Sequence, residues 1–101
     1  MVQGNLMEQL QELDLSANKL KDEGVQVLAA ASKWKALKQL RLSQNMFGDD
    51  GAKALGESTS LGGLTHLYIG RNYFGNEGAQ AIYESKTLTV LKTLVLKEGV
   101  E

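Results

Sequence analysis

LTHLYIGRNYFGNEG, residues 64–78, is one of three related versions of a segment in this chain. The others read LKQLRLSQNMFGDDG at 37–51 and LQELDLSANKLKDEG at 10–24, each 27 residues from the next with no insertion or deletion. Such a fixed period is typical of repeat proteins, in which one supersecondary unit stacks on its neighbours. We expect one domain with a partial repeat over 1–9, full repeats over 10–36, 37–63 and 64–90, and a terminal strand over 91–101.

The composition is that of an ordinary soluble globular protein, with 43% hydrophobic residues, 23% charged residues and a net charge of -1. The chain has no cysteine, which excludes disulfides and thiolate metal sites. Positive and negative residues nearly balance, which argues against nucleic acid or an anionic membrane as the partner. No run reaches transmembrane length, and no signal-peptide core is present. We expect a cytoplasmic protein without metal or cofactor.

Alternating leucines predict a short strand in every unit. Leu13 and Leu15 alternate with polar neighbours, which is the period of a strand with one buried face, and the pattern returns 27 residues later. An asparagine follows each of the first three strands, and a buried amide is costly unless it has partners. We therefore expect a structural ladder in which these side chains bond the backbone of adjacent turns. Its members are Asn18, Asn45 and Asn72.

The segments DEG at 22–24, DDG at 49–51 and NEG at 76–78 predict helix starts. Asp and Asn are strong N-caps, and a neighbouring acidic residue suits the positive end of a helix dipole. A glycine in the first helical turn costs about 0.5–1 kcal/mol relative to alanine. Its recurrence indicates that a Cβ at this position would collide with the strand layer.

The pattern Leu-x-x-Leu-x-Leu-x-x-Asn-x-Leu/Phe, followed by a glycine-bearing helix start, resembles the leucine-rich repeat over residues 10–98. The segment GNEGAQAI at 75–82 is similar to the helix-containing subtype seen in ribonuclease inhibitor, the GTPase-activating protein of Ran and the sensor regions of nucleotide-binding innate immune receptors. The resemblance implies an α/β fold, a curved right-handed solenoid with parallel strands on its concave face and helices on its convex face. It also implies intracellular protein–protein recognition without catalysis, because the Ran activator's catalytic arginine has no counterpart here.

The expected concave face carries the candidate binding residues. Strands about 4.8 Å apart and helices about 10 Å wide make such a stack curve with the strands inside. Between its leucines each strand then presents variable positions, which form three columns across the stack. The first column is Glu12, Gln39, His66 and Thr93, the second is Asp14, Arg41, Tyr68 and Val95, and the third is Ser16, Ser43, Gly70 and Lys97. Arg41 lies within reach of an ion pair with Asp14 and a cation–π contact with Tyr68. Arg and Tyr often anchor interfaces, so we predict a patch of Arg41, His66 and Tyr68, with Asp14 and Arg71 beside it. Neutral drift of solvent-exposed positions would give the same variation.

Three other features have simpler interpretations than chemistry. His66 is the only histidine, and it fits an exposed strand residue better than a catalytic base, which would need a nucleophile and an orienting group. Trp34 lies between two lysines, but its register with Leu61 and Leu88 favours the core over nucleic-acid stacking. The GDDG segment at 48–51 lacks the Gly-Lys-Ser/Thr of a phosphate loop.

Two functions therefore remain open. The first is a non-enzymatic module that recognises a protein partner through the concave face. The second is a structural or assembly segment, including a fragment of a larger leucine-rich repeat protein. Such a segment would form homo-oligomers through its uncapped terminal repeats, because repeat arrays need polar caps at both ends.

Overall fold

The computed structural model describes residues 6–97, so the outermost residues of the expected partial repeat and terminal strand, 1–5 and 98–101, lie outside it. Strands and helices alternate along the described chain. In order they are α1 (Leu6–Gln9), β1 (Glu12–Asp14), α2 (Lys21–Ala30), β2 (Gln39–Arg41), α3 (Asp49–Glu57), β3 (His66–Tyr68), α4 (Asn76–Tyr83) and β4 (Thr93–Val95).

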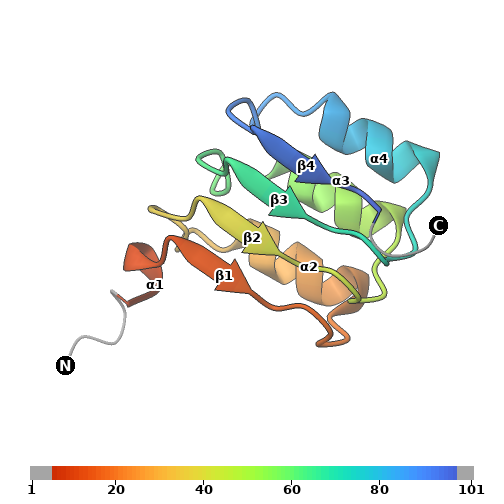
Figure 1. The fold of residues 1–101 in the computed structure, drawn as a ribbon, viewed down its shortest axis with the longest axis horizontal. Helices are drawn as coiled ribbons and strands as arrows, with labels where there is room; N and C mark the ends of the chain where they lie inside the picture. Colours follow the sequence, from red (N-terminus) through yellow and green to blue (C-terminus); the bar gives the residue numbers. More distant parts are fainter. Residues whose placement is uncertain (1–5, 98–101) are drawn as a thin grey trace.

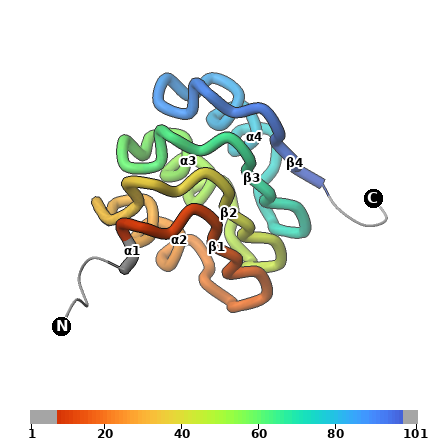
Figure 2. Tube along the Cα trace, turned by 60° about the vertical axis from the view of Figure 1, so that its left-hand side comes forward, coloured from red at the N-terminus to blue at the C-terminus, as the bar shows by residue number. Residues whose placement is uncertain are grey.

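The strands form one parallel sheet in the order β1-β2-β3-β4. Figure 1 shows the strands side by side, with α2, α3 and α4 behind them on one face of the sheet. The turned view in Figure 2 shows the chain as successive coils stacked from β1 to β4. The register pairs each strand residue with the residue 27 positions on, so Leu13 lies opposite Leu40, and Leu40 opposite Leu67. The expected α/β solenoid of parallel strands is confirmed.

The core lies between the sheet and the helices. Leu40 and Leu67 are fully buried from the strand side, and Val25 and Leu55 from the helices. The rings of Phe47 and Phe74 stack with centroids 5.8 Å apart, which continues the core between adjacent turns. At both ends of the stack the equivalent leucines are only partly buried: Leu10, Leu13, Leu15, Leu91, Leu94 and Leu96.

Trp34 belongs to this core. It is 5% exposed, and its indole Nε1–H donates to the carbonyl oxygen of Leu28 at 2.9 Å. A buried tryptophan normally finds such a partner for its N–H. The core interpretation of Trp34 is therefore confirmed, and its flanking lysines do not make it a stacking site.

The asparagines that follow the strands join adjacent units. The Oδ1 of Asn45 accepts the Asn18 N–H at 2.9 Å, and its Nδ2 donates to Leu15 O in the preceding unit at 3.0 Å. Asn72 repeats this arrangement, accepting the Asn45 N–H at 2.7 Å and donating to Leu42 O at 3.1 Å. Asn45 is completely buried. Each of these two side chains therefore satisfies backbone groups of its neighbour that no strand pairing reaches.

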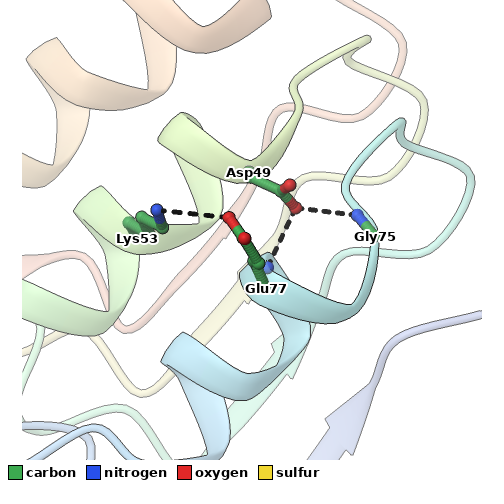
Figure 3. A network of polar contacts seen from close by, with 5 residues as sticks. Asp49, Lys53, Gly75 and Glu77 are labelled. Atoms are coloured by element: carbon green, nitrogen blue, oxygen red, sulfur yellow. Dashed lines mark hydrogen bonds and ion pairs between the residues drawn. The ribbon is translucent and has the colours of Figure 1, made fainter.

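The aspartates at the helix starts act on the following unit, and the expectation that each caps its own helix is wrong. Asp49 is the first residue of α3 and makes no cap bond there. Its Oδ1 accepts the N–H of Gly75 at 2.8 Å and of Gly78 at 2.9 Å, at the start of α4 (Figure 3). Asp22 bonds Gly48 and Gly51 in the same way, each at 2.8 Å. The N-cap residues are glycines without a side chain, so the acceptor comes from the preceding unit.

This arrangement also explains the recurring glycines. A Cβ at Gly78 would lie 2.7 Å from Asp49 Oδ1 and 2.8 Å from Phe74 Cβ. A Cβ at Gly51 would lie 2.9 Å from Asp22 Oδ1. The collision is thus with the capping carboxylate and the aromatic side chain of the turn, rather than with the strand layer as expected. Glycine lets the aspartate reach the backbone N–H of the next helix.

Hydroxyl groups at the other end of the helices form a third set of links. Ser58 Oγ donates to Ala29 O in α2, and Ser85 Oγ donates to Gly56 O in α3, both at 2.6 Å. Carbonyls in the last turn of a helix have no partner within the helix, so these bonds satisfy them. Ser58 and Ser85 are 27 residues apart, so the repeat period itself is a signal for these links, which were not among the expected contacts.

Candidate functional site

The face of the sheet opposite the helices displays the variable strand residues, and we call it the strand face. It comprises Glu12, Asp14, Gln39, Arg41, His66, Tyr68, Thr93 and Val95. The register aligns Asp14, Arg41 and Tyr68 in one row across three adjacent strands. Gln39 and His66 belong to the parallel row beside it. Figure 1 shows that the helices leave this face uncovered.

Arg41 and Tyr68 form the central contact of the strand face. The Arg41 Cζ lies 4.1 Å from the centroid of the Tyr68 ring, and both residues are half-buried. A guanidinium stacked on a ring interacts through its planar face and keeps its N–H donors at its edge. The contact therefore restrains both side chains and leaves the polar atoms at their edges able to form hydrogen bonds.

Asp14 lies beside this pair without bonding to it. Among the described residues, Arg41 and Asp14 form no ion pair within 4.0 Å. The Asp14 Oδ1 instead accepts the Ser16 N–H at 3.0 Å. This backbone hydrogen bond is the main reason that the pKa of Asp14 lies below its ordinary value, followed by the hydrogen bond with the Ser16 side chain. Desolvation raises the pKa, and the charge of Arg41, the smallest of the four effects, lowers it.

His66 is held by its neighbour in the chain. Its Nδ1 lies 2.8 Å from the Thr65 hydroxyl, which also lies 3.2 Å from Lys38 O in the preceding unit. Arg71 is placed differently, because it follows β3 in an exposed turn with a φ of 58°. The structure thus brings Arg41, His66 and Tyr68 together, puts Asp14 one strand away, and leaves Arg71 at the edge.

One contact on the strand face joins two groups that can exchange a proton. Thr65 and His66 form a hydroxyl–imidazole contact, and among residues 6–97 no third group forms a hydrogen bond that orients the ring. Within residues 6–97, no cluster of three His, Cys, Asp or Glu side chains could hold a metal ion. None of the helices in the described range is long and apolar enough to cross a membrane.

Two residues next to the strand face were not among those selected from the sequence. Lys38 and Lys92 immediately precede β2 and β4, in the same repeat position as Thr65. Both are exposed, and the Thr65 contact with His66 ties this position to the strand face. Reading the repeat columns one residue further would have found them.

Comparison with known protein families gives one finding that bears on this architecture. The sequence model of the family described as Leucine Rich repeat matches residues 9–29, 36–56 and 64–82. These segments contain β1 to β3 and most of the helix that follows each of them. Comparison with curated proteins gives no match.

Proposed function

Because this chain belongs to the leucine-rich repeat family, we propose that it is a non-enzymatic module that recognises a protein partner through its strand face. Leucine-rich repeats are generally protein-interaction modules, and their domains are typically without catalytic activity. We further assign the chain to the helix-containing, ribonuclease-inhibitor-like subtype. The support is that each full return between strands contains a helix: α2, α3 or α4.

The stack of Arg41 on Tyr68 carries the proposal. Interface anchors are most often Trp, Tyr and Arg, and side chains that are already restrained lose less conformational entropy on binding. The 4.1 Å contact restrains two residues of these types, Arg41 and Tyr68, on an uncovered face. His66 lies on the same strand as Tyr68, with Asp14 and Arg71 at the margins of the patch.

The proposal places this module in the cytoplasm. Its support is compositional, because the sequence holds no cysteine that an oxidising compartment would pair.

A double substitution tests the binding face. Arg41→Ala with Tyr68→Ala is expected to leave the circular dichroism spectrum unchanged and to abolish co-purification of the protein that wild type retains from the source cell. The matched control is Lys53→Ala with Tyr83→Ala, which removes one cation and one tyrosine from the exposed helical side. Equal loss of the retained protein in both variants would overturn the proposal.

Self-association is the second candidate function, and one observation favours it. Leu64, Leu67 and Ile69 are fully buried. Their counterparts at β4, which are Leu91, Leu94 and Leu96, are only partly buried. Within the described residues β4 pairs with β3 alone, so its other edge is open to a second copy.

Light scattering distinguishes this function from the first. An end-to-end homo-oligomer should dissociate on dilution, and Leu94→Lys with Leu96→Lys should abolish it without affecting capture of another protein. A monomer mass that is independent of concentration would count against self-association.

A further inference from the structure

Positive charge is concentrated around three of the four strands. Residues 38–44, 65–71 and 92–97, which contain β2, β3 and β4, hold five cations and no Asp or Glu, and the residue that follows Lys97 in the sequence is Glu98. These cations, which we call the basic strip, are Lys38, Arg41, Arg71, Lys92 and Lys97. The exposed acids Glu23, Asp50, Glu57, Glu77 and Glu84 instead belong to α2, α3, α4 and the C-cap of α4. The helices and the loops beside them also hold six lysines, so their charges nearly cancel, and the largest excess of one sign lies in the segments around β2 to β4.

The sign also changes along the strand face. The first strand and its flanks, residues 11–17, carry Glu12 and Asp14 and no cation. The register puts Asp14 directly opposite Arg41, so the change from negative to positive occurs between β1 and β2. Adjacent strands lie about 4.8 Å apart, which makes this an abrupt boundary.

The basic strip matches a short extended peptide in length. From β2 to β4 is two strand spacings, or about 10 Å, and an extended chain advances about 3.3 Å per residue. Lys92 precedes β4 and Lys97 follows it, so this strand has a cation at both ends. A segment with three or four carboxylates would therefore span the strip.

We infer that the partner docks an acidic protein segment on β2 to β4, and that this segment changes to positive charge where it reaches β1. This inference rests on the proposed function and specifies the chemistry of its partner. Complementary potentials at an interface steer association and fix the orientation of the partner. The negative β1 and the positive strip together define one direction for the bound segment.

The acidic residues of β1 favour a protein over a nucleic acid. A phosphate backbone is uniformly negative, so continuing it across the sheet would bring it against Glu12 and Asp14. The hydrogen-bonded Asp14 keeps its charge, because its pKa is lowered by the Ser16 N–H. A polypeptide can reverse its sign within one or two residues, whereas a nucleic acid cannot.

Fluorescence anisotropy with synthetic probes tests the inference. One labelled probe has four glutamates followed by Gly, Ser and two lysines, and the second has the same composition with the charges alternating. At low salt the segregated probe should bind about fivefold more tightly, as expected for one additional exposed ion pair of about 1 kcal/mol. The preference should shrink in about 0.5 M salt, because screening weakens exposed charge pairs.

Variants locate the binding charges. Lys92→Gln with Lys97→Gln should weaken binding of the segregated probe about fivefold or more. Lys53→Gln, which removes an equivalent exposed lysine from the helical side, should leave it unchanged. A third probe of eight glutamates should bind wild type less tightly than the segregated probe, because its far end meets the acids of β1. Glu12→Gln with Asp14→Asn should remove this difference in affinity.

Several outcomes would overturn the inference. The first is that the segregated and alternating probes bind with equal affinity or do not bind. The second is that Lys92→Gln with Lys97→Gln leaves the affinity unchanged. The third is that an oligothymidine octamer binds as tightly as the segregated probe. The proposed function has its own point of failure. Capture of a cellular protein could require Arg41 and Tyr68 and yet be unaffected by salt and by the Lys92 and Lys97 substitutions. That result would support the proposed binding face and contradict the acidic partner.

Discussion

The carboxylate of Asp49 in one repeat accepts the N–H of Gly78 in the next, at 2.9 Å. The same oxygen also accepts the N–H of Gly75, the N-cap residue of α4. An aspartate at the start of α3 therefore performs the capping of α4. In this protein the side chain that caps a helix comes from the preceding repeat.

Asp49→Ala should therefore destabilise the start of α4 rather than that of α3. We expect a loss of about 0.5–2 kcal/mol in the free energy of unfolding, the range for removing an N-cap acceptor. Amide hydrogen exchange should accelerate at Gly75 and Gly78. Asp50→Ala, which removes the adjacent exposed carboxylate, is the control and should change little. Faster exchange confined to the first turn of α3 would contradict this assignment.

Asn45→Ala should cost about 1–3 kcal/mol in urea unfolding, because it leaves buried backbone groups without partners. Asn45 accepts from Asn18 and donates to both Leu15 O and Leu42 O. Asn18→Ala is the comparison, since the Asn18 side chain is exposed and bonds Leu15 O and Ser16 O within its own turn. Losses of the same size in both variants would argue against a ladder between repeats.

Gly56→Ala should destabilise the protein although alanine is the better helix former by about 1 kcal/mol. A Cβ at Gly56 in α3 would lie 2.7 Å from the carbonyl oxygen of Ala81 in α4, and a backbone atom cannot turn aside. We expect a net loss of about 1–3 kcal/mol, the usual cost of overpacking. Gly75→Ala is the control, because no heavy atom lies within 4 Å of its added Cβ. Thermal unfolding of the two variants decides the sign, and a stabilised Gly56→Ala protein would refute the close approach of α3 and α4.

The pKa of Asp14 should follow the order of its causes. Ser16→Ala should raise the pKa by more than Arg41→Gln does, because the Ser16 side chain lowers it more than the Arg41 charge does. Both variants keep the Ser16 backbone N–H, so the pKa should stay below the ordinary value of 3.8. Titration of the Asp14 carboxyl carbon by NMR measures all three proteins. A larger rise in Arg41→Gln would mean that the neighbouring charge dominates.

The sign of the effect of Asp14 on stability is fixed by the same shift. A folded-state pKa below the unfolded value stabilises the fold above the unfolded pKa. That contribution disappears as the pH falls through the folded-state value. We therefore expect Asp14→Asn to reduce the acid dependence of stability in this low pH range, as measured by urea unfolding at successive pH values.

The fold was predictable because its strongest signals repeat. The 27-residue period fixed which strand residues lie opposite each other, so the rows through Arg41 and His66 follow from counting alone. Capping could not be assigned in this way. The sequence places Asp49 next to its own helix, whereas the acceptor it supplies is used 26 and 29 residues later. Only the packing of one repeat on the next reveals which helix each aspartate caps.

The candidate site was predictable in position but not in detail. The sequence placed Arg41 between Asp14 and Tyr68, and both contacts were physically reasonable. In the structure Arg41 lies over the Tyr68 ring, while Asp14 is occupied by the Ser16 N–H two residues away. Local hydrogen bonds of this kind compete with contacts across strands and leave no periodic signal.

The bonds made by Asn45, Asp49 and Ser58 all run to a neighbouring repeat. Lengthening or shortening this array should therefore succeed only in whole multiples of 27 residues. One extra residue between Asn45 and Ser58 would change the spacing that places these donors and acceptors against their partners. The molecule is in this sense modular, with a fixed unit of growth that protein engineers could use and that natural duplication would have to respect.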